Sequence, residues 1–280
     1  MTSESLPPPS RRSLAPPPPA PGFIARTKDS FSAVLEHLGG MSEMAYGTVR
    51  AVFRRPFEGR AIITQIESLG VASVGIVATT SIFIGMVMAV QFAFGLRKFG
   101  GMEYTGRVVG LSFARELAPT FTAVIVGGRI GAGMAAELGS MAVTEQLDAV
   151  RALGADPLKK LVLPRLVASI IVMPILGSLA LVLGFSGAMI VTDYQFNIPS
   201  SFFLRSALGT VTMRDFLSGV FKTPFFGAII ALVGCHFGMT TRGGTAGVGN
   251  STTRTVVVIS ITILIADFWL TKVAILAWPT

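Results

Sequence analysis

The chain contains several uncharged apolar runs that are long enough to cross a bilayer, and the clearest of them is Val71 to Phe94. These 24 consecutive residues exceed the roughly 20 that an α-helix needs to cross the hydrocarbon core. In lipid every backbone N–H and C=O must be bonded within the protein, and a helix achieves this within one segment. The run therefore predicts a transmembrane helix, around which the rest of the chain must fold.

Four more apolar runs predict an all-α integral membrane protein with five transmembrane helices. The spans are predicted at about 71–94, 108–136, 166–192, 223–241 and 255–278. The second span carries Arg115, Glu116 and Arg129, which are costly in contact with lipid. Small residues recur in it at four-residue spacing, as at Gly127 and Gly131, so neighbouring helices can approach closely and shelter the charges inside a bundle.

The composition agrees with a membrane protein and excludes several other classes. Hydrophobic residues make up 51% of the chain and charged residues only 14%, against roughly a quarter in soluble domains. The single cysteine, Cys235, excludes an internal disulfide framework, and no clustered Cys and His ligands predict a metal site. The net charge of +8 lies in the N-terminal stretch and the linkers without interleaved aromatics, which favours membrane orientation over nucleic-acid binding.

The sequence before the first span divides into two parts. Residues 1–22 are rich in proline and lack the apolar core of a signal peptide, so they are predicted to be a disordered cytoplasmic tail. Residues 23–67 mix apolar and basic side chains, which predicts amphipathic helices lying on an anionic membrane face. Residues 68–280 then form the membrane domain.

The distribution of lysine and arginine predicts the orientation of the spans. Basic residues are frequent in the N-terminal region and in the connection after the second span. The connections assigned to the outside hold only Arg97, Lys98, Arg107, Arg205, Arg214 and Lys222. The positive-inside bias therefore predicts a cytoplasmic N-terminus and, with five spans, a C-terminus on the outer side.

Two glycine-rich stretches resemble nucleotide-binding loops but lack their context. Gly131, Gly133 and Ala136 give a GxGxxA pattern without the flanking strands and acidic ribose partner of a dinucleotide site, so helix packing is favoured. The stretch from Gly243 to Gly249 lacks the Lys-Ser/Thr of a phosphate loop. The chain therefore contains no ATPase motif, and it is predicted not to be an enzyme.

The segment from Glu137 to Pro157 is the most polar patterned part of the membrane domain. Val143, Leu147, Val150 and Leu153 share one face at helical spacing, and Gly154 can end a helix. The pattern predicts a short amphipathic helix on the cytoplasmic side, with an ordinary solvated loop as the alternative. Such a helix would give the membrane domain a surface on the cytoplasmic side through which it could sense the motion of a separate partner.

Several motifs in one order resemble the MlaE/YrbE family of ABC-transporter permeases. They are Arg115-Glu-Leu-Ala-Pro119, Gly127-Gly-Arg-Ile-Gly131, Glu137-Leu-Gly-Ser-Met141, Thr144-Glu-Gln146, Asp156-Pro157, Pro164-Arg165, Thr252-Thr-Arg-Thr-Val256 and Asp267-Phe268. The similarity runs from about Arg60 to the C-terminus. The proline-rich tail lies outside it, and Ala118 stands where the family often has glycine.

The resemblance implies a homodimeric permease in the bacterial inner membrane that moves phospholipids or related hydrophobic molecules between inner and outer membranes. Its partners would be two cytoplasmic ATPase subunits, which use ATP and Mg²⁺, and a periplasmic MCE-domain protein, while this chain would bind no cofactor. The motion of the ATPases would reach the membrane through the 137–157 segment. The residues assigned to this coupling are Glu137, Met141, Thr144, Glu145, Asp148, Arg151 and Asp156.

Candidate substrate contacts lie in the first two spans. Adjacent residues on a helix point about 100° apart, so Arg115 is assigned to a lipid phosphate and Glu116 to the partner helix or cavity wall. The alternative is that both serve only packing. The acyl chains are assigned to Met88, Gln91, Phe92 and Phe99.

Two other classes of function remain open from the residues alone. A proton-coupled secondary carrier would use Glu116, His236 and Asp267, and it would work without a nucleotide-binding partner. A membrane scaffold would transport nothing. Asp267 requires a partner in either case, because an aspartate deep in a span must be compensated.

Overall fold

The computed structural model describes residues 23–52 and 59–277, and the predicted tail at 1–22 lies outside these residues. The chain divides into two units, residues 1–40 and 41–280, and α1 (Phe23–Val52) crosses the boundary between them. The larger unit holds the end of α1 and all the remaining helices.

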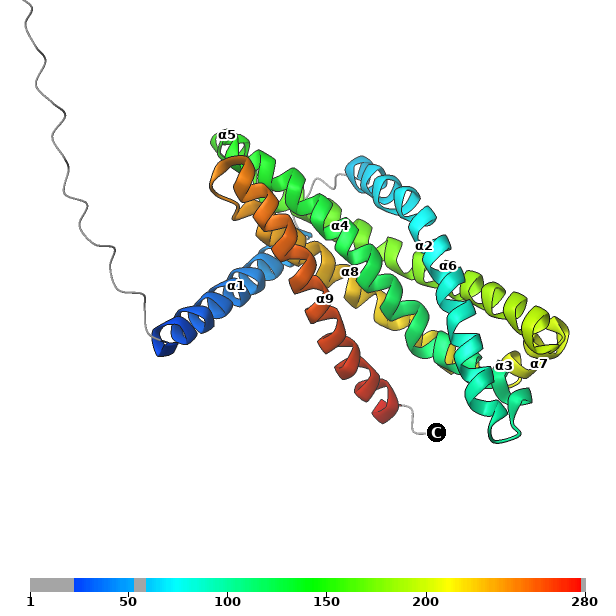
Figure 1. Ribbon diagram of the computed structural model, residues 1–280. Helices are drawn as coiled ribbons and strands as arrows, with labels where there is room; N and C mark the ends of the chain where they lie inside the picture. Colours follow the sequence, from blue (N-terminus) through cyan, green and yellow to red (C-terminus); the bar gives the residue numbers. More distant parts are fainter. Residues whose placement is uncertain (1–22, 53–58, 278–280) are drawn as a thin grey trace, which may run out of the picture. The chain divides into compact units, whose positions relative to one another are not determined.

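The described residues are helical almost throughout and contain no strand. After α1 come α2 (Gly59–Arg97), α3 (Thr105–Ser112), α4 (Ala118–Val143), α5 (Gln146–Ala152), α6 (Leu163–Phe196), α7 (Ser200–Leu208), α8 (Met213–Met239) and α9 (Gly244–Ala277). A 3₁₀-turn, η1 (Met102–Tyr104), precedes α3, and two π-turns, η2 (Phe113–Leu117) and η3 (Leu158–Val162), precede α4 and α6. Consecutive helical segments therefore join into a few long rods (Figure 1).

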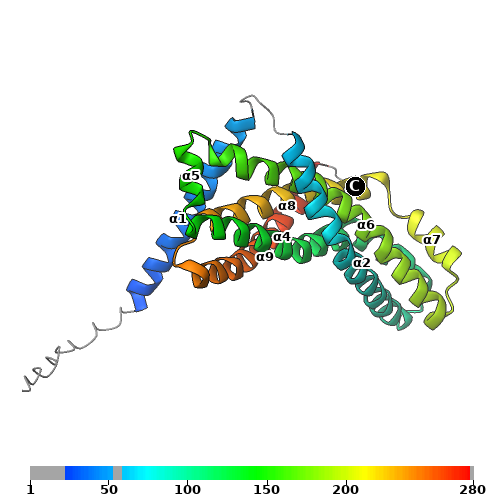
Figure 2. The ribbon, with the colours of Figure 1, turned by 90° about the horizontal axis from the view of Figure 1, so that it is seen from above.

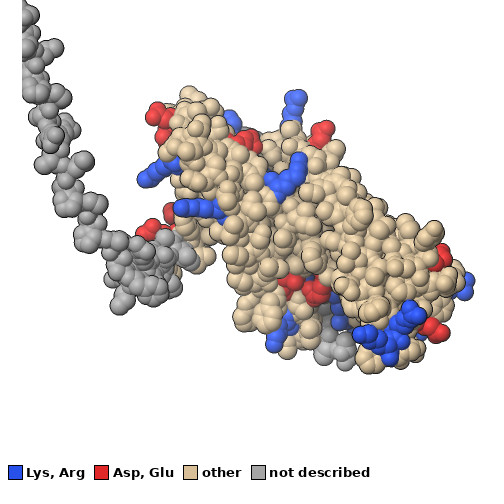
Figure 3. Space-filling model, in the orientation of Figure 1, with Lys and Arg blue, Asp and Glu red and all other residues tan. Residues whose placement is uncertain are grey.

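Five of these rods are long and apolar enough to cross a membrane. They are Gly59–Arg97, Met102–Val143, Leu158–Phe196, Met213–Met239 and Gly244–Leu276. The predicted all-α membrane protein with five transmembrane helices is confirmed. The face seen in Figure 3 is dominated by uncharged side chains, as expected for a surface that contacts lipid.

The helices extend beyond the predicted spans. The 39 residues of α2 measure about 58 Å at 1.5 Å per residue, well over the hydrocarbon core of about 30 Å. Residues 59–67, predicted to be part of a separate interfacial helix, are continuous with α2. The predicted placement of Lys222 in an outside connection is wrong, because α8 starts at Met213 and Lys222 lies buried within it.

The bundle is built from two sets of long contacts. α2 packs along α6, and α4 packs along α8 and α9, with α6 and α8 joining the two sets. α5 lies at one end of the bundle, and α3 and α7 lie at the other (Figures 1 and 2). The predicted coupling segment, which contains α5, therefore lies a full helix length away from α3 and α7.

Glycines set how closely the helices approach. A Cβ atom on Gly85 of α2 would overlap the carbonyl group of Gly184 of α6, so the two backbones touch at this crossing. On α4, a Cβ on Gly131 would overlap the Ile259 side chain of α9. The predicted close packing of the small residues of the second span is confirmed, and the GxGxxA pattern lies inside a helix rather than in a nucleotide-binding turn.

The contact between α2 and α6 predicts that glycine-to-alanine substitutions at two positions of α2 differ in their effect on stability. Gly85→Ala should destabilise the protein by about 1–3 kcal/mol, because the added methyl group meets a backbone that cannot move away. Gly75→Ala adds its methyl group to open space and should be neutral or stabilising, because alanine favours the helix. Thermal unfolding of both variants in detergent would measure the difference, and equal melting temperatures would contradict this packing.

Candidate functional site

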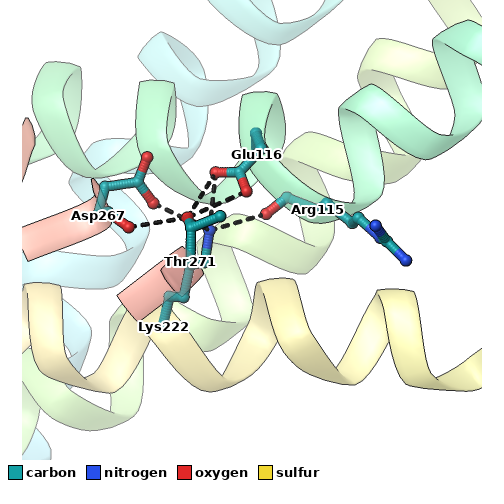
Figure 4. A network of polar contacts seen from close by, with 5 residues as sticks. All are labelled: Arg115, Glu116, Lys222, Asp267 and Thr271. Carbon is teal, nitrogen blue, oxygen red and sulfur yellow. Dashed lines mark hydrogen bonds and ion pairs between the residues drawn. The ribbon is translucent and has the colours of Figure 1, made fainter. Parts of the chain in front are cut away.

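The candidate site begins at the π-turn η2, where α3 passes into α4. In this wider turn the N–H of Ala118 bonds to the carbonyl of Phe113, five residues earlier, so one extra residue enters the helix. Such turns are frequent at functional sites because they redirect side chains. The turn contains Arg115 and Glu116, whose side chains diverge: the Arg115 guanidinium points away from the cluster that holds the Glu116 carboxylate (Figure 4).

Lys222 of α8 lies at the centre of this cluster. Its side chain is 3% exposed, and its Nζ lies 2.7 Å from Oε2 of Glu116 and 3.0 Å from Oδ1 of Asp267. Nζ also lies 2.7 Å from the Thr271 hydroxyl and 3.3 Å from the backbone oxygen of Arg115. A buried ammonium group with three hydrogens requires such a set of acceptors. Asp267 thus has the partner that its depth in a span demands.

Thr271 of α9 connects the Glu116 carboxylate to the backbone of Asp267. Its hydroxyl lies 3.1 Å from Oε1 of Glu116 and 2.8 Å from the backbone oxygen of Asp267. η2, α8 and α9 therefore meet through one polar network, drawn in Figure 4. Lys222 follows Met213, the first residue of α8, by nine positions, which places the network roughly 14 Å along that helix.

Arg115 is bound on its other side by Asp215 in the first turn of α8. Nε of Arg115 lies 2.6 Å from Oδ1 of Asp215, while Oδ2 accepts the backbone N–H and the hydroxyl of Thr212, both at 2.8 Å. Thr212 and Asp215 form a capping box, so the same carboxylate starts α8 and holds the arginine. The Asp215 side chain is 5% exposed but that of Arg115 is 38% exposed, so the arginine side chain is only partly buried.

An apolar groove of about 450 Å³ lies beside this ion pair. Its walls come from α6, α7 and the start of α8, with Phe185, Leu208 and Phe216 among the lining residues. Ala114 and Thr212 also line it, and they are the neighbour of Arg115 and the hydrogen-bond partner of Asp215. The groove therefore offers an apolar surface close to a positively charged side chain that is only partly buried.

The substrate residues predicted on α2 do not line this groove. Met88 and Phe92 are half-buried and pack against the core of the bundle. Gln91 is exposed, and Phe99 is 87% exposed in the turn that follows α2. The structure thus brings Arg115 and Glu116 together with α8 and α9, and it leaves these four residues on a separate surface.

At the other end of the bundle, the predicted coupling segment, residues 137–157, lies within what we call the α4–α6 elbow, residues 137–165. Glu137 and Met141 belong to α4, and α5 has only seven residues. The break between them is Glu145, whose φ of 62° is left-handed and ends the helical run before α5 begins. Leu147 is buried but Leu153 is 86% exposed, so the predicted apolar face is shorter than the pattern suggested.

The polar side chains of the elbow lie on its surface. Thr144, Glu145, Asp148, Arg151 and Asp156 are all exposed. Arg151 and Asp148 form an ion pair at 2.9 Å within α5, and the Asp156 carboxylate accepts the N–H of Leu158 at 2.9 Å, where the chain turns into η3. Gly154, with φ of +75°, ends the turn after α5. These residues form a compact exposed corner rather than a loose loop.

The three residues of the carrier alternative do not gather in one place. Glu116 and Asp267 share Lys222, but His236 lies 14 positions further along α8, roughly 21 Å away at 1.5 Å per residue. His236 is buried and its ring packs edge-on against Phe237. Among the described residues, no three His, Cys, Asp or Glu side chains are arranged to hold a metal ion.

The sequence did not predict Lys222, Asp215 or Thr271 as parts of the site. Lys222 and Asp215 lie in the first part of α8, which is too polar for hydropathy to include in a span. Lys222 and Asp215 are separated by seven residues, which places both on one face of a helix. This spacing is the sequence pattern that could have identified them as site residues. That face then has to meet charges from another span, and Arg115 and Glu116 are the pair that does so.

Taken together, the five long apolar helices and the ion network inside them define a polytopic membrane protein whose helices are joined by buried charges. Comparison with known proteins makes the class specific. The family described as permease MlaE matches residues 62–273, and the chain therefore belongs to the MlaE family of ABC-transporter permeases.

Individual relatives support this membership over most of the chain. A probable ABC transporter permease protein of Synechocystis is 41% identical over 211 residues, which are 75% of this chain and 80% of the relative. A probable ABC transporter permease protein of Rickettsia felis is 37% identical over 85% of this chain and 92% of its own length. The chloroplastic protein TRIGALACTOSYLDIACYLGLYCEROL 1 of Arabidopsis thaliana is 38% identical over 80% of this chain and 64% of its own length.

The network predicts that Lys222 is essential for stability. Lys222→Met leaves the Glu116 and Asp267 carboxylates without their cation and should destabilise the protein by about 3–5 kcal/mol, seen as a lower melting temperature and yield. Lys272→Met is the matched control, because this α9 lysine is exposed and lies over the ring of Phe268. Adding Glu116→Gln and Asp267→Asn to Lys222→Met should restore most of the stability. A triple variant as unstable as the single one would contradict this account.

Proposed function

We propose that this chain is the permease subunit of an ABC transporter that moves phospholipids or related hydrophobic molecules between the inner and outer membranes of a bacterium. The observation that carries the proposal is the partly exposed side chain of Arg115, whose neighbour Ala114 lines an apolar groove in a membrane-spanning bundle. A positive group next to an apolar surface complements an amphiphile with an anionic head and acyl chains. The name of the Arabidopsis relative is that of a diacylglycerol lipid with an uncharged sugar head, which agrees with a lipid that has acyl chains but does not bear on the anionic head.

Arg115 and Glu116 would have different roles at the lipid headgroup. The planar fork of an arginine suits a phosphate, and Asp215 holds Arg115 at one edge while the arginine side chain stays only partly buried. Glu116 is bound by Lys222 and Thr271, so it forms the wall of the site rather than a free anion. The lipid tail has two candidate surfaces, the groove beside α7 and the side of α2 that carries Met88, Gln91 and Phe92.

The transporter would be assembled from several chains. Five spans without an evident inverted repeat are few for a self-contained carrier, so a second copy of this chain would supply a two-fold pathway. Membership of the ABC permeases implies an ATPase partner, and ATP and Mg²⁺ would be bound in two cytoplasmic subunits of that kind. A periplasmic MCE-domain protein would receive or deliver the lipid. In this arrangement the N-terminus is cytoplasmic and the C-terminus periplasmic.

The ATPase subunits would bind the α4–α6 elbow. The charged side chains on and beside α5 are exposed at the end of the bundle opposite α3 and α7, and α5 projects from two long helices that reach the site. Nucleotide-dependent closure of the ATPases would move α5, and α4 would carry this movement to η2, where Arg115 and Glu116 lie.

Lipid crosslinking tests the substrate surfaces. A photoreactive side chain in place of Phe216 in the groove or Phe92 on α2 should crosslink phospholipid more than one in place of Phe225, which is exposed on α8 outside the groove. In the Phe216 variant, adding Arg115→Gln should reduce crosslinking to phospholipid several-fold, because the phosphate loses its partner. Equal crosslinking at all three positions would mean that only bulk lipid is being sampled.

Charge reversal on α5 tests the partner and the activity together. Glu145→Lys combined with Asp148→Lys should reduce co-purification of the ATPase and ATP-driven lipid transfer, because an interface charge of this kind contributes about 2–5 kcal/mol when buried by a partner. Arg205→Glu, on exposed α7 at the other end, is the control for general damage. If assembly and transfer in the double variant equal those of the control, the elbow is not the ATPase contact.

A further inference from the structure

The base of the α4–α6 elbow is closed by an ion pair. Arg165, in the first turn of α6, places Nη2 2.6 Å from Oε1 of Glu137, near the end of α4. Its side chain is 5% exposed, whereas that of Glu137 is 58% exposed. Nη1 of Arg165 also donates to the carbonyl of Leu161 in η3, at 2.7 Å. One guanidinium therefore bonds both to the helix that enters the elbow and to the turn that leaves it.

This pair joins the two ends of a segment that has few other anchors. Between residues 138 and 161 the chain runs through the end of α4, the left-handed Glu145, α5 and Gly154 before it reaches η3. Within α5 only Leu147 is buried. α4 and α6 also pack on each other, so the ion pair adds a polar bond between these two arms at the point where the elbow leaves the bundle.

The two helices that the pair joins belong to different sets of packed helices. α4 packs along α8 and α9, which hold Lys222 and Asp267, while α6 packs along α2. At the end of the bundle that carries α5, the Glu137–Arg165 pair thus ties these two sets together directly. The exposed position of Glu137 and the burial of Arg165 place the pair at the surface edge of the bundle, where the elbow begins.

We propose that Glu137 and Arg165 are positioning residues for coupling, which clamp the base of the elbow so that a displacement of α5 moves α4 and α6 as one body. The proposal rests on the proposed function, in which an ATPase acts on α5. It gives Glu137 an internal role: its carboxylate binds Arg165 of the same chain rather than the ATPase. Loss of the clamp should leave the ATPase bound and active while less of its work reaches the lipid.

The test uses the full complex of the permease with its ATPase, reconstituted in lipid vesicles. Three quantities are measured for each variant: the amount of ATPase that co-purifies, the rate of ATP hydrolysis, and the lipid transferred per ATP hydrolysed. For Glu137→Ala we expect co-purification within about twofold of the unchanged protein and at least a threefold lower transfer per ATP. Glu137→Gln, which keeps a hydrogen-bond acceptor but not the charge, should fall between the two.

Two further sets of variants assign the effect to the pair. Glu103→Ala is the matched control, because Glu103 is an exposed glutamate in η1 at the opposite end of the bundle, and its transfer per ATP should be unchanged. Arg165→Met should lower transfer per ATP as Glu137→Ala does, and the two changes combined should be no worse than the more severe single change. Non-additivity of this kind is the signature of residues that act through one contact.

Several results would overturn the proposal. A transfer per ATP in Glu137→Ala equal to that of Glu103→Ala would show that the clamp has no part in coupling. Loss of the ATPase from Glu137→Ala, as large as that expected for Glu145→Lys, would make Glu137 a contact residue instead. Fully additive defects of Glu137→Ala and Arg165→Met would separate the two residues. A large fall in melting temperature for both Glu137→Ala and Glu137→Gln would assign the pair to folding.

Failure of the proposed function gives a different pattern. If the elbow does not bind the ATPase, the α5 charge reversals are harmless whatever the Glu137 variants do. If only the clamp is wrong, the α5 reversals remain defective while Glu137→Ala transfers lipid normally. The two hypotheses are therefore separated within one set of measurements.

Discussion

The arrangement of this bundle depends on how one buried ammonium group is compensated. In a low-dielectric interior an unpaired charge is very unfavourable, so the Lys222 side chain requires anionic partners from other helices. Those partners come from η2 and α9, which are more than forty residues away along the chain in either direction. The need to satisfy Lys222 thus fixes the relative positions of α4, α8 and α9. The glycines of α4 make this geometry reachable, because they let the three backbones approach closely enough for the side chains to meet.

Apolar runs were sufficient to predict the five transmembrane helices, but the tertiary partners of their charged residues were not predictable. Arg115 and Glu116 stand out as charges within an apolar segment, so the sequence identifies them as candidates. Their partners depend on which faces of distant helices meet, and no local pattern encodes that. Hydropathy also shortens α8, because it treats Lys222 as a residue that must face water. The left-handed backbone at Glu145 has no sequence signal, since glycine and asparagine are the usual residues in that conformation.

The two polar regions of the molecule are joined by α4. This helix starts directly after the π-turn that carries Arg115 and Glu116, and it runs through 26 residues, about 39 Å, to the elbow at its other end. It contains Glu137 of the elbow and packs against two of the helices that hold the ion network. A rigid rod that touches both regions gives a direct physical route between them, because a packed helix moves as a unit rather than bending at each residue.

The hydrogen bonds of Asp215 affect how easily Arg115 can change its partner. Its carboxylate accepts two hydrogen bonds from Thr212 as well as those from Arg115, so it stays solvated by protein donors if the guanidinium turns away. If an anion took the place of Asp215 on the arginine, the Asp215 carboxylate would therefore keep its two hydrogen bonds from Thr212. The first turn of α8 keeps its cap throughout such an exchange. In the proposed function, capture of an anionic headgroup at Arg115 would then be an exchange of one oxygen acceptor for another.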